Sequence, residues 1–289
     1  MELIVHRGAC RYDPALAVPL ARALAAEPDL FDRLTGLRDD ALAARGSLQR
    51  RLRLTPALHA RAELLAAAPG GVVPGGAPGD DDLPPLAAAL AHLGRYRPFF
   101  AAVRARCGVP RRRLDPRTAA LLAEVMAEHA PLVQPAAVVA LGDARVEQAG
   151  VTVGGLSIAS ADLARALRPG AAADGRTRVA LFAATIGPAL DERVAALAPA
   201  EPTRALLLNA FGAAAAELGG EDVSARVAAA LPGPGRLRRF HLGYGDWTLA
   251  GQGDLLALLG AERALEIRVT AAGVMVPEKS VSGLVSRRG

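Results

Sequence analysis

The chain has 289 residues, of which 52% are hydrophobic, and it carries a formal net charge of +5 at pH 7. This length predicts one or two domains with a sizeable core, and the apolar content excludes a disordered tail protein. Every stretch of about 18 residues contains a charge, so we expect no transmembrane helix. The first residues, MELIVHRGACRYDP, lack the pattern of a signal peptide, and we expect a cytoplasmic protein without a membrane partner.

The basic balance does not by itself indicate a nucleic-acid partner. Lys279 is the only lysine, so 33 of the 34 basic residues are arginines, a pattern typical of GC-rich codon usage. Aromatic residues make up 3% of the chain, too few for a base-stacking surface, and we expect no nucleic acid to bind. Cys10 and Cys107 lie far apart and outside any CxxC pattern, so neither a metal site nor a disulfide framework is predicted.

The front of the chain has the pattern of an all-helical region. Leucines recur at helical spacing between residues 14 and 68, and we treat 1–68 as a helical region of unknown role. Residues 69–85, PGGVVPGGAPGDDDLPP, predict a flexible linker, and 86–114 a connecting helix. This front resembles no family that we recognise, and its simplest interpretation is a helical cap or a docking module.

From residue 115 onward the pattern changes to a mixture of helices and short strands. Asp115 followed by Pro116 is a favourable N-cap and first-turn pair for a helix. Further helices are expected over 160–167, from Pro188, from Pro202 past Glu217 to a break at Gly219 and Gly220, and over 248–259. Strands are expected over 136–141, 145–155, 178–185, 237–242, 265–270 and 273–277, followed by a last short strand. Residues 115–289 therefore have an α+β pattern.

Two segments near the C-terminus carry the residues best suited to bind a small molecule. Residues 239–247 read RFHLGYGDW, and residues 275–283 read MVPEKSVSG. An arginine grips a carboxylate with two parallel hydrogen bonds, glycines let the backbone approach a ligand, and Tyr244 and Trp247 offer aromatic faces for a flat ring or a cation. The first segment is also compatible with a tight turn that has a capping Asp246 and a buried Trp247. The chain has no P-loop, GxSxG or strand-linked GxGxxG motif, and no catalytic residue is assigned.

These segments, with Gln252 and the leucine-rich helix between them, resemble the activation domain of vitamin B12-dependent methionine synthase. That family carries an R-x-x-x-G-Y motif and, after a helix, an M-x-P segment followed by S-V-S-G. Its stand-alone form, which often reads S-P-G-Y-G-D-W, is the most similar. Three upstream pieces occur in the same order: Ser160-x-Asp162, ATIG at 184–187, and Glu217. The resemblance covers residues 115–289 and implies an α+β fold with a twisted, mainly antiparallel sheet.

The resemblance implies a function in methionine biosynthesis. In the family, a flavodoxin-like donor reduces inactive cob(II)alamin, and the resulting cob(I)alamin takes the methyl group of S-adenosylmethionine held by the activation domain. We therefore expect an S-adenosylmethionine-binding accessory subunit that reactivates a methyltransferase. The sequence has no cobalamin-binding D-x-H-x-x-G motif. The expected partners are a separate cobalamin-binding methionine synthase that lacks its own activation domain, and a flavodoxin-like or other reductase.

The resemblance also assigns ligand-binding residues around the first segment. It implies that Arg239 binds the ligand carboxylate, that Gly243 permits close backbone contact, and that Tyr244 lies along the ligand. Asp246 matches the stand-alone form only. Arg238, one position from Arg239 on the expected strand, should face the opposite side.

Three further ligand-site residues come from other parts of the chain. Glu217 matches a helix glutamate that meets the cationic amino group of the ligand. Ser280 and Ser282 match the S-V-S-G turn, which is expected to shape the site from behind.

The sequence departs from the family pattern at two places. His241 and Leu242 replace the usual Ser-Pro or Ala-Pro, and AAG at 271–273 stands where the family often has a polar pair and an aromatic residue. These departures leave open a second hypothesis, a non-catalytic interaction module that kept the fold and lost ligand binding. A third hypothesis is an unrelated basic helical protein.

The linker composition generates a first test. Because Gly, Pro and Asp bury too little apolar surface to offset the entropy of ordering the chain, residues 69–82 should be cut first in limited proteolysis. The cut sites are read by mass spectrometry of the early fragments. Resistance of this stretch under conditions that cleave elsewhere would count against a separate front region.

Overall fold

The computed structural model describes residues 2–7, 103, 106–107, 115–233 and 235–287. The predicted linker 69–85, the helical region from residue 8 to 68, and nearly all of the connecting helix at 86–114 lie outside the described residues. The chain divides into two compact units. The first combines Met1–Tyr12, Leu132–Arg193 and Ala215–Gly289, and the second combines Asp13–Pro131 and Val194–Ala214.

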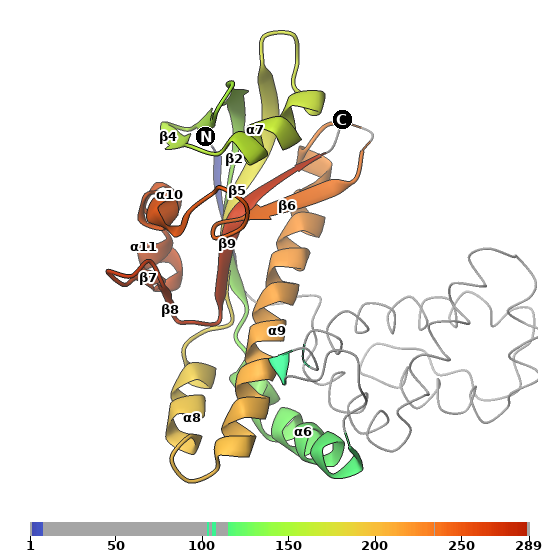
Figure 1. Cartoon of the computed structure of the whole chain (residues 1–289), viewed down its shortest axis with the longest axis vertical. Coiled ribbons are helices and arrows are strands. Elements are labelled where there is room, and N and C mark those ends of the chain that lie inside the picture. Colours follow the sequence, from blue (N-terminus) through green and yellow to red (C-terminus); the bar gives the residue numbers. More distant parts are fainter. Residues whose placement is uncertain (1, 8–102, 104–105, 108–114, 234, 288–289) are drawn as a thin grey trace, which may run out of the picture. The chain divides into compact units, whose positions relative to one another are not determined.

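The first unit contains an antiparallel sheet, as the α+β prediction required (Figure 1). Its strand order is β4-β3-β2-β5-β9-β6, and β1 pairs with the edge of β2 that lies opposite β5. Every pairing in this sheet is antiparallel. The strands are β1 (Glu2–Arg7), β2 (Ala136–Val146), β3 (Val151–Val153), β4 (Leu156–Ile158), β5 (Arg176–Thr185), β6 (Leu237–His241) and β9 (Ser280–Arg287).

Strand β1 corrects the prediction that the chain begins with a helical region. It pairs with β2 from Glu2, opposite Leu141, to Arg7, opposite Ala136. The partner strand lies more than a hundred residues along the chain, so local periodicity carries no trace of the pairing. These residues form a strand because they pair with the edge of β2 that lies opposite β5.

Both faces of the sheet are covered by helices. Alternate residues of β2 point to opposite faces, so Val138 and Ala140 join one core while Ala137 and Val139 join the other. The first core packs against α7 (Ala161–Leu167), α10 (Gln252–Leu259) and α11 (Ala261–Leu265). The second packs against the C-terminal half of α9 (Pro202–Val227) through Val223 and Val227. Burial on both faces explains why the strand reads AVVAL and does not alternate with polar residues.

Helix α9 runs through the glycine pair at which a break was predicted. It continues past Gly219 and Gly220 to Val227. A Cβ at Gly220 would lie 2.9 Å from Arg239 Nη1 and 3.3 Å from Val281 Cγ2. The glycine therefore lets the helix approach the sheet closely, and tertiary contact outweighs its low helix propensity.

Two strands predicted in the C-terminal part are present but shorter than expected. The strand expected over 265–270 is shortened to β7 (Arg268–Val269), because α11 occupies the chain up to Leu265. The strand expected over 273–277 is shortened to β8 (Met275–Val276), which pairs with β7 in a separate two-stranded sheet. The expected last short strand is the eight-residue β9, which lies inside the main sheet between β5 and β6.

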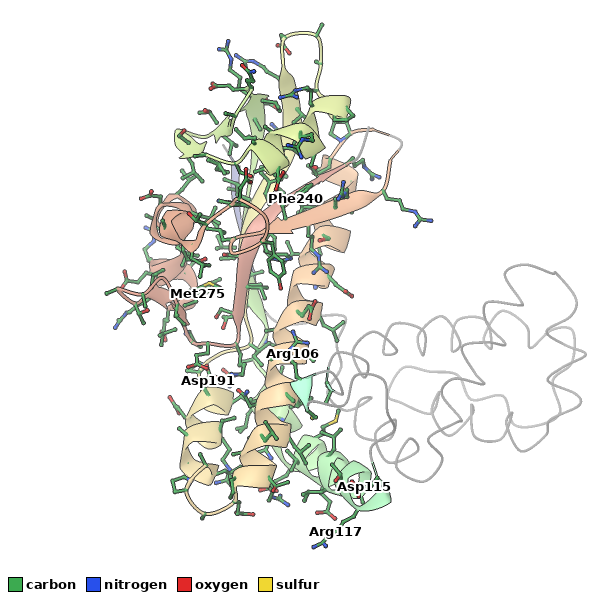
Figure 2. All side chains as sticks on the ribbon, viewed as in Figure 1. Arg106, Asp115, Arg117, Asp191, Phe240 and Met275 are labelled. Atoms are coloured by element: carbon green, nitrogen blue, oxygen red, sulfur yellow. The ribbon has the colours of Figure 1, made fainter. Side chains whose placement is uncertain are left out.

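The remaining helices agree with the sequence to within a few residues. The helix predicted to start at Asp115 is α6 (Pro116–His129). The helix predicted from Ser160 is α7, and the helix predicted from Pro188 is α8 (Ala189–Leu197). Short 3₁₀ turns follow or precede the helices, at Ala130–Leu132, Arg168–Gly170, Ala228–Ala230 and Leu249–Gly251. Asp115 lies at the start of α6 (Figure 2), and its Oδ1 accepts the backbone N–H of Thr118 at 3.0 Å, as an N-cap should.

In the second unit, one arginine joins α6 to the first half of α9. The Arg204 guanidinium contacts Glu128, lies 3.7 Å from Glu124 and lies 3.3 Å from Glu201. Three carboxylates around one planar cation form a network, which fixes side chains better than an isolated surface pair does.

The pairing of β6 with β9 gives a test of the fold. A Cβ at Gly283 would lie 2.1 Å from the Phe240 carbonyl oxygen, a backbone atom that cannot move alone. We expect Gly283→Ala to lower the free energy of unfolding by about 2–4 kcal/mol, measured by urea denaturation. The control is Gly253→Ala in α10, where a Cβ meets nothing within 4 Å and should be neutral or stabilising. Equal stability of the two variants would show that β6 does not lie against β9 in this way.

Candidate functional site

A groove of about 650 Å³ lies along β6, the last strand of the sheet. Its walls are residues of α7, of α9, of β6 itself and of the turn after β6. Three residues assigned to the ligand from the sequence, Glu217, Arg239 and Tyr244, line this groove. They come from a helix, a strand and a turn, so the fold gathers them from different elements.

The other four assigned residues do not line the groove. Gly243 and Asp246 belong to the turn after β6, and Ser280 and Ser282 are buried in β9. Their contacts support the residues that do line it.

The turn after β6 is tight and is built on two glycines. Gly243 N donates to Trp247 O at 2.7 Å, and Trp247 N donates to Tyr244 O at 3.3 Å. Gly243 and Gly245 have φ values of 83° and 61°, in the region that favours glycine. Trp247 is buried, while Tyr244 is 76% exposed. The turn thus has the buried tryptophan of the alternative interpretation and still presents Tyr244 to the groove.

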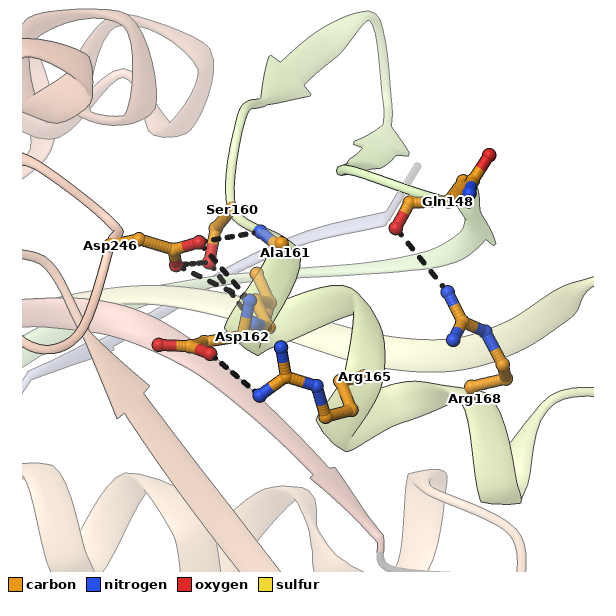
Figure 3. Close-up of polar contacts among 8 residues, drawn as sticks. Gln148, Ser160, Ala161, Asp162, Arg165, Arg168 and Asp246 are labelled. Atoms are coloured by element: carbon orange, nitrogen blue, oxygen red, sulfur yellow. Dashed lines mark hydrogen bonds and ion pairs between the residues drawn. The ribbon is translucent and has the colours of Figure 1, made fainter.

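Asp246 does not cap its own turn but contacts the start of α7, whose N-cap is Ser160 (Figure 3). Its carboxylate accepts hydrogen bonds from Ser160 Oγ at 2.5 Å and from the backbone N–H of Ala161 at 2.7 Å. Asp162 N donates to Asp246 Oδ2 at 3.2 Å. The hydrogen bond from Ser160, followed by those from the backbone, lowers the pKa of the Asp246 carboxyl below its ordinary value. Asp246 therefore fastens the turn to the start of α7, which is one wall of the groove.

Arg239 is held against α9. Its Nη1 donates to the Glu217 carbonyl oxygen at 3.2 Å, and its Nη2 lies 3.4 Å from Glu221 Oε1. These contacts use two of the five guanidinium N–H groups, and among the described residues the other three make no hydrogen bond. The guanidinium is oriented and retains donors for a second carboxylate.

Arg238 faces away from Arg239, as expected, but it also lines the groove. Its guanidinium carbon lies 5.3 Å from the centre of the Phe240 ring, a cation–π contact on the α7 side of the strand. Both sides are part of the groove because β6 is an edge strand and the groove wraps around it. A substitution of Arg238 would therefore also change the lining of the groove.

His241 is the residue of the groove that the sequence reasoning missed. It was read only as a departure from the family motif, although it lies two positions after Arg239 and so on the same face of the strand. Its Nδ1 is 3.0 Å from the Ser282 carbonyl oxygen. Burial, with the charge of Arg239, lowers the pKa of the imidazole, while the hydrogen bond to Ser282 and the charge of Glu217 act in the opposite direction.

The two serines of β9 lie behind the strand that carries these residues. Gln252 Nε2 donates to Ser282 Oγ at 2.8 Å, with both residues buried. Ser280 Oγ donates to Thr185 Oγ1 at 2.9 Å, inside the sheet. Ser282 thus contacts the groove indirectly, through His241, and Ser280 contributes to the packing of β9 on β5.

The described part of the chain has neither a metal-binding cluster nor a membrane-spanning helix. These residues contain no cluster of three or more His, Cys, Asp or Glu side chains that could hold a metal ion. Within the same ranges, the helices are too short or too polar to cross a membrane.

Comparisons with known proteins give a distant structural match. The chain is similar to a solved structure described as "Crystal Structure of the MetH Reactivation Domain bound to AdoHcy", with 15% sequence identity and a TM-score of 0.46. The match covers 60% of this chain and 65% of that chain, slightly less than two thirds of its length. No protein-family model matches the sequence, and no curated protein does.

The cap on α7 gives a test of the site's architecture. Because the pKa of Asp246 is lowered by folding, its carboxylate stabilises the fold above the unfolded-state pKa, and this contribution is lost as pH falls through the folded-state value. We expect Asp246→Asn to lower the melting temperature at pH 7, and the difference from the unmutated chain to shrink below about pH 4. Thermal unfolding followed by circular dichroism measures both.

The control for this test is Asp254→Asn, an exposed aspartate on α10. It removes the same charge without touching α7. A loss of stability that is equal in the two variants, or independent of pH in Asp246→Asn, would contradict the capping role.

Proposed function

We propose that the chain binds S-adenosylmethionine in the β6 groove and presents its methyl group for the reductive methylation of cob(II)alamin on a separate corrinoid protein. The observation that carries this proposal is the meeting of Glu217, Arg239 and Tyr244 in one groove. All three match ligand-binding residues in the motifs of the family that the sequence resembles. If the resemblance were accidental, residues of a helix, a strand and a turn would not be expected to line the same groove.

The charges of the groove suit this ligand. S-adenosylmethionine carries a carboxylate, an ammonium group, a sulfonium and an adenine ring. Arg239 retains N–H donors for the carboxylate, and the groove includes the acidic side chains of Glu217 and Asp162 for the two cationic groups. Tyr244, largely exposed beside the groove, offers an aromatic face for the adenine or the sulfonium.

In this reaction the main role of the chain is to position the ligand. A reductase would supply one electron to cob(II)alamin, and the reduced cobalamin would take the methyl group of the ligand. S-adenosylhomocysteine is the other product. The residues named above bind and orient the ligand, and an oriented methyl group lowers the entropic part of the barrier. The electron donor would be a flavodoxin-like or other reductase, and the corrinoid protein a methionine synthase without its own activation domain or a related methyltransferase. The cytoplasm is the expected compartment.

The alternative is an interaction module that kept the fold and lost the ligand. Two observations favour it. Arg239 already contacts Glu221, and the Ala271 and Ala272 side chains, in the exposed turn after β7, offer no polar group. Such a module would keep the stability of the sheet and fail to bind the ligand, so a titration separates the two functions.

Replacement of Arg239 tests the proposal. We expect Arg239→Ala to weaken S-adenosylmethionine binding by about 2–4 kcal/mol, because the ligand carboxylate loses a charge-assisted partner. Arg239→Lys should recover part of this loss, since it keeps the charge but not the planar fork. Isothermal titration calorimetry gives the affinities, and methyl transfer to cob(II)alamin with a chemical reductant gives a second readout.

The matched control is Arg178→Ala on β5. Arg178, like Arg239, pairs with a carboxylate, that of Asp143 at 3.3 Å, but it does not line the groove. We expect its affinity for the ligand to be unchanged. Failure of the unmutated chain to bind at millimolar ligand, or equal losses in Arg178→Ala and Arg239→Ala, would reject the proposal and favour the interaction module.

A further inference from the structure

The imidazole of His241 is fixed in one orientation at the wall of the groove. A carbonyl oxygen can only accept, so the 3.0 Å contact with Ser282 requires Nδ1 to carry the proton. In the neutral ring, Nε2 is then a hydrogen-bond acceptor. Among the described residues, none donates a hydrogen bond to it.

The neighbours of the ring keep this orientation. The edge of the ring meets Phe182, with ring centres 5.8 Å apart and planes at 82°. Ser282 is itself fixed, because it lies inside the sheet and its hydroxyl accepts from the buried Gln252. A ring held on two sides loses little conformational entropy when a ligand binds to its third side.

The charged groups around the ring come from three elements. Arg239 lies on β6, Glu217 and Glu221 lie on α9, and Asp162 lies on α7 across the groove. Tyr244, in the turn, has its ring centre 6.3 Å from that of His241. Burial and Arg239 favour the neutral imidazole and lower its pKa, so at pH 7–8 the groove presents an acceptor nitrogen next to a cation.

We propose that His241 is a ligand-contacting residue of the groove, and that its Nε2 accepts a hydrogen bond from a hydroxyl or amino group of bound S-adenosylmethionine. This inference rests on the proposed function, since it names a further contact of the same site. The ligand has donors of both kinds, on its ribose, its adenine and its amino-acid end. Ser282 acts as a positioning residue, because its carbonyl selects the tautomer.

The test is a calorimetric titration of S-adenosylmethionine into the unmutated chain and into His241→Asn, at several values between pH 5 and pH 8. Asparagine can still donate to the Ser282 carbonyl, but it has no atom in the place of Nε2. We expect binding at pH 8 to be about three- to tenfold weaker in His241→Asn, the loss of one neutral hydrogen bond. Binding to the unmutated chain should weaken more steeply as the pH falls, because a protonated ring cannot accept and adds a positive charge beside Arg239.

The difference between the two pH profiles isolates His241, because every other ionisable group of the groove is the same in both proteins. The control is His129→Asn. His129 is buried in α6, and its Nδ1 contacts the Val125 carbonyl at 2.9 Å, but it does not line the groove. Its pH profile should match that of the unmutated chain. Nitrogen-15 NMR of the imidazoles adds a readout without ligand: His241 should carry its proton on Nδ1, and added S-adenosylmethionine should shift Nε2.

The outcomes separate this inference from the proposed function. If the unmutated chain binds the ligand and His241→Asn has the same affinity and pH profile, the His241 contact is wrong and the proposed function stands. A proton on Nε2 in the free protein also overturns the contact. If the unmutated chain does not bind S-adenosylmethionine, both the proposed function and the contact are overturned.

Discussion

The close approach of helix α9 to the sheet at Gly220 is the constraint on which the groove depends. A Cβ at this position would lie 2.9 Å from Arg239 Nη1, the movable end of that side chain, and 3.3 Å from Val281 Cγ2. Because the helix comes so near, the Glu217 carbonyl and the Glu221 carboxylate reach the guanidinium of Arg239 and orient it. A larger residue at 220 would displace the Arg239 guanidinium from these contacts.

The opposite wall is fixed in a different way. Helix α7 has seven residues, too short to be stable alone, and its first N–H groups are satisfied by the Asp246 carboxylate from the turn after β6. Strand β6 and the turn after it are therefore connected to both walls. Arg239 contacts α9, and Asp246 contacts α7. Gly283 of β9 permits the third contact, the close approach of the β6 backbone from the side of the sheet.

The sequence predicted well those features that depend on neighbouring residues. The N-cap at Asp115, the helix opened by Ser160 and the buried Trp247 follow from local chemistry, and the structure contains them. Features set by distant partners were missed or wrong. Strand β1 depends on β2, and α9 continues through Gly220 where the helix packs closely against the sheet.

The same division holds for the candidate site. Motif residues Arg239, Tyr244 and Glu217 could be named from the sequence, but their meeting in one groove is a property of the fold. Asp246 was assigned to the ligand, whereas its contacts place it in the cap of α7. His241 could not be predicted, because a lone histidine carries no sequence signal for its contact with the Ser282 carbonyl or for its place in the lining of the groove.

The central claim, that the β6 groove is an S-adenosylmethionine site, is tested most directly by a crystal structure of the chain grown with this ligand. The account predicts electron density for the ligand along β6, with its carboxylate within about 3 Å of the Arg239 guanidinium. An empty groove at saturating ligand, or a ligand bound away from α7 and α9, would contradict it.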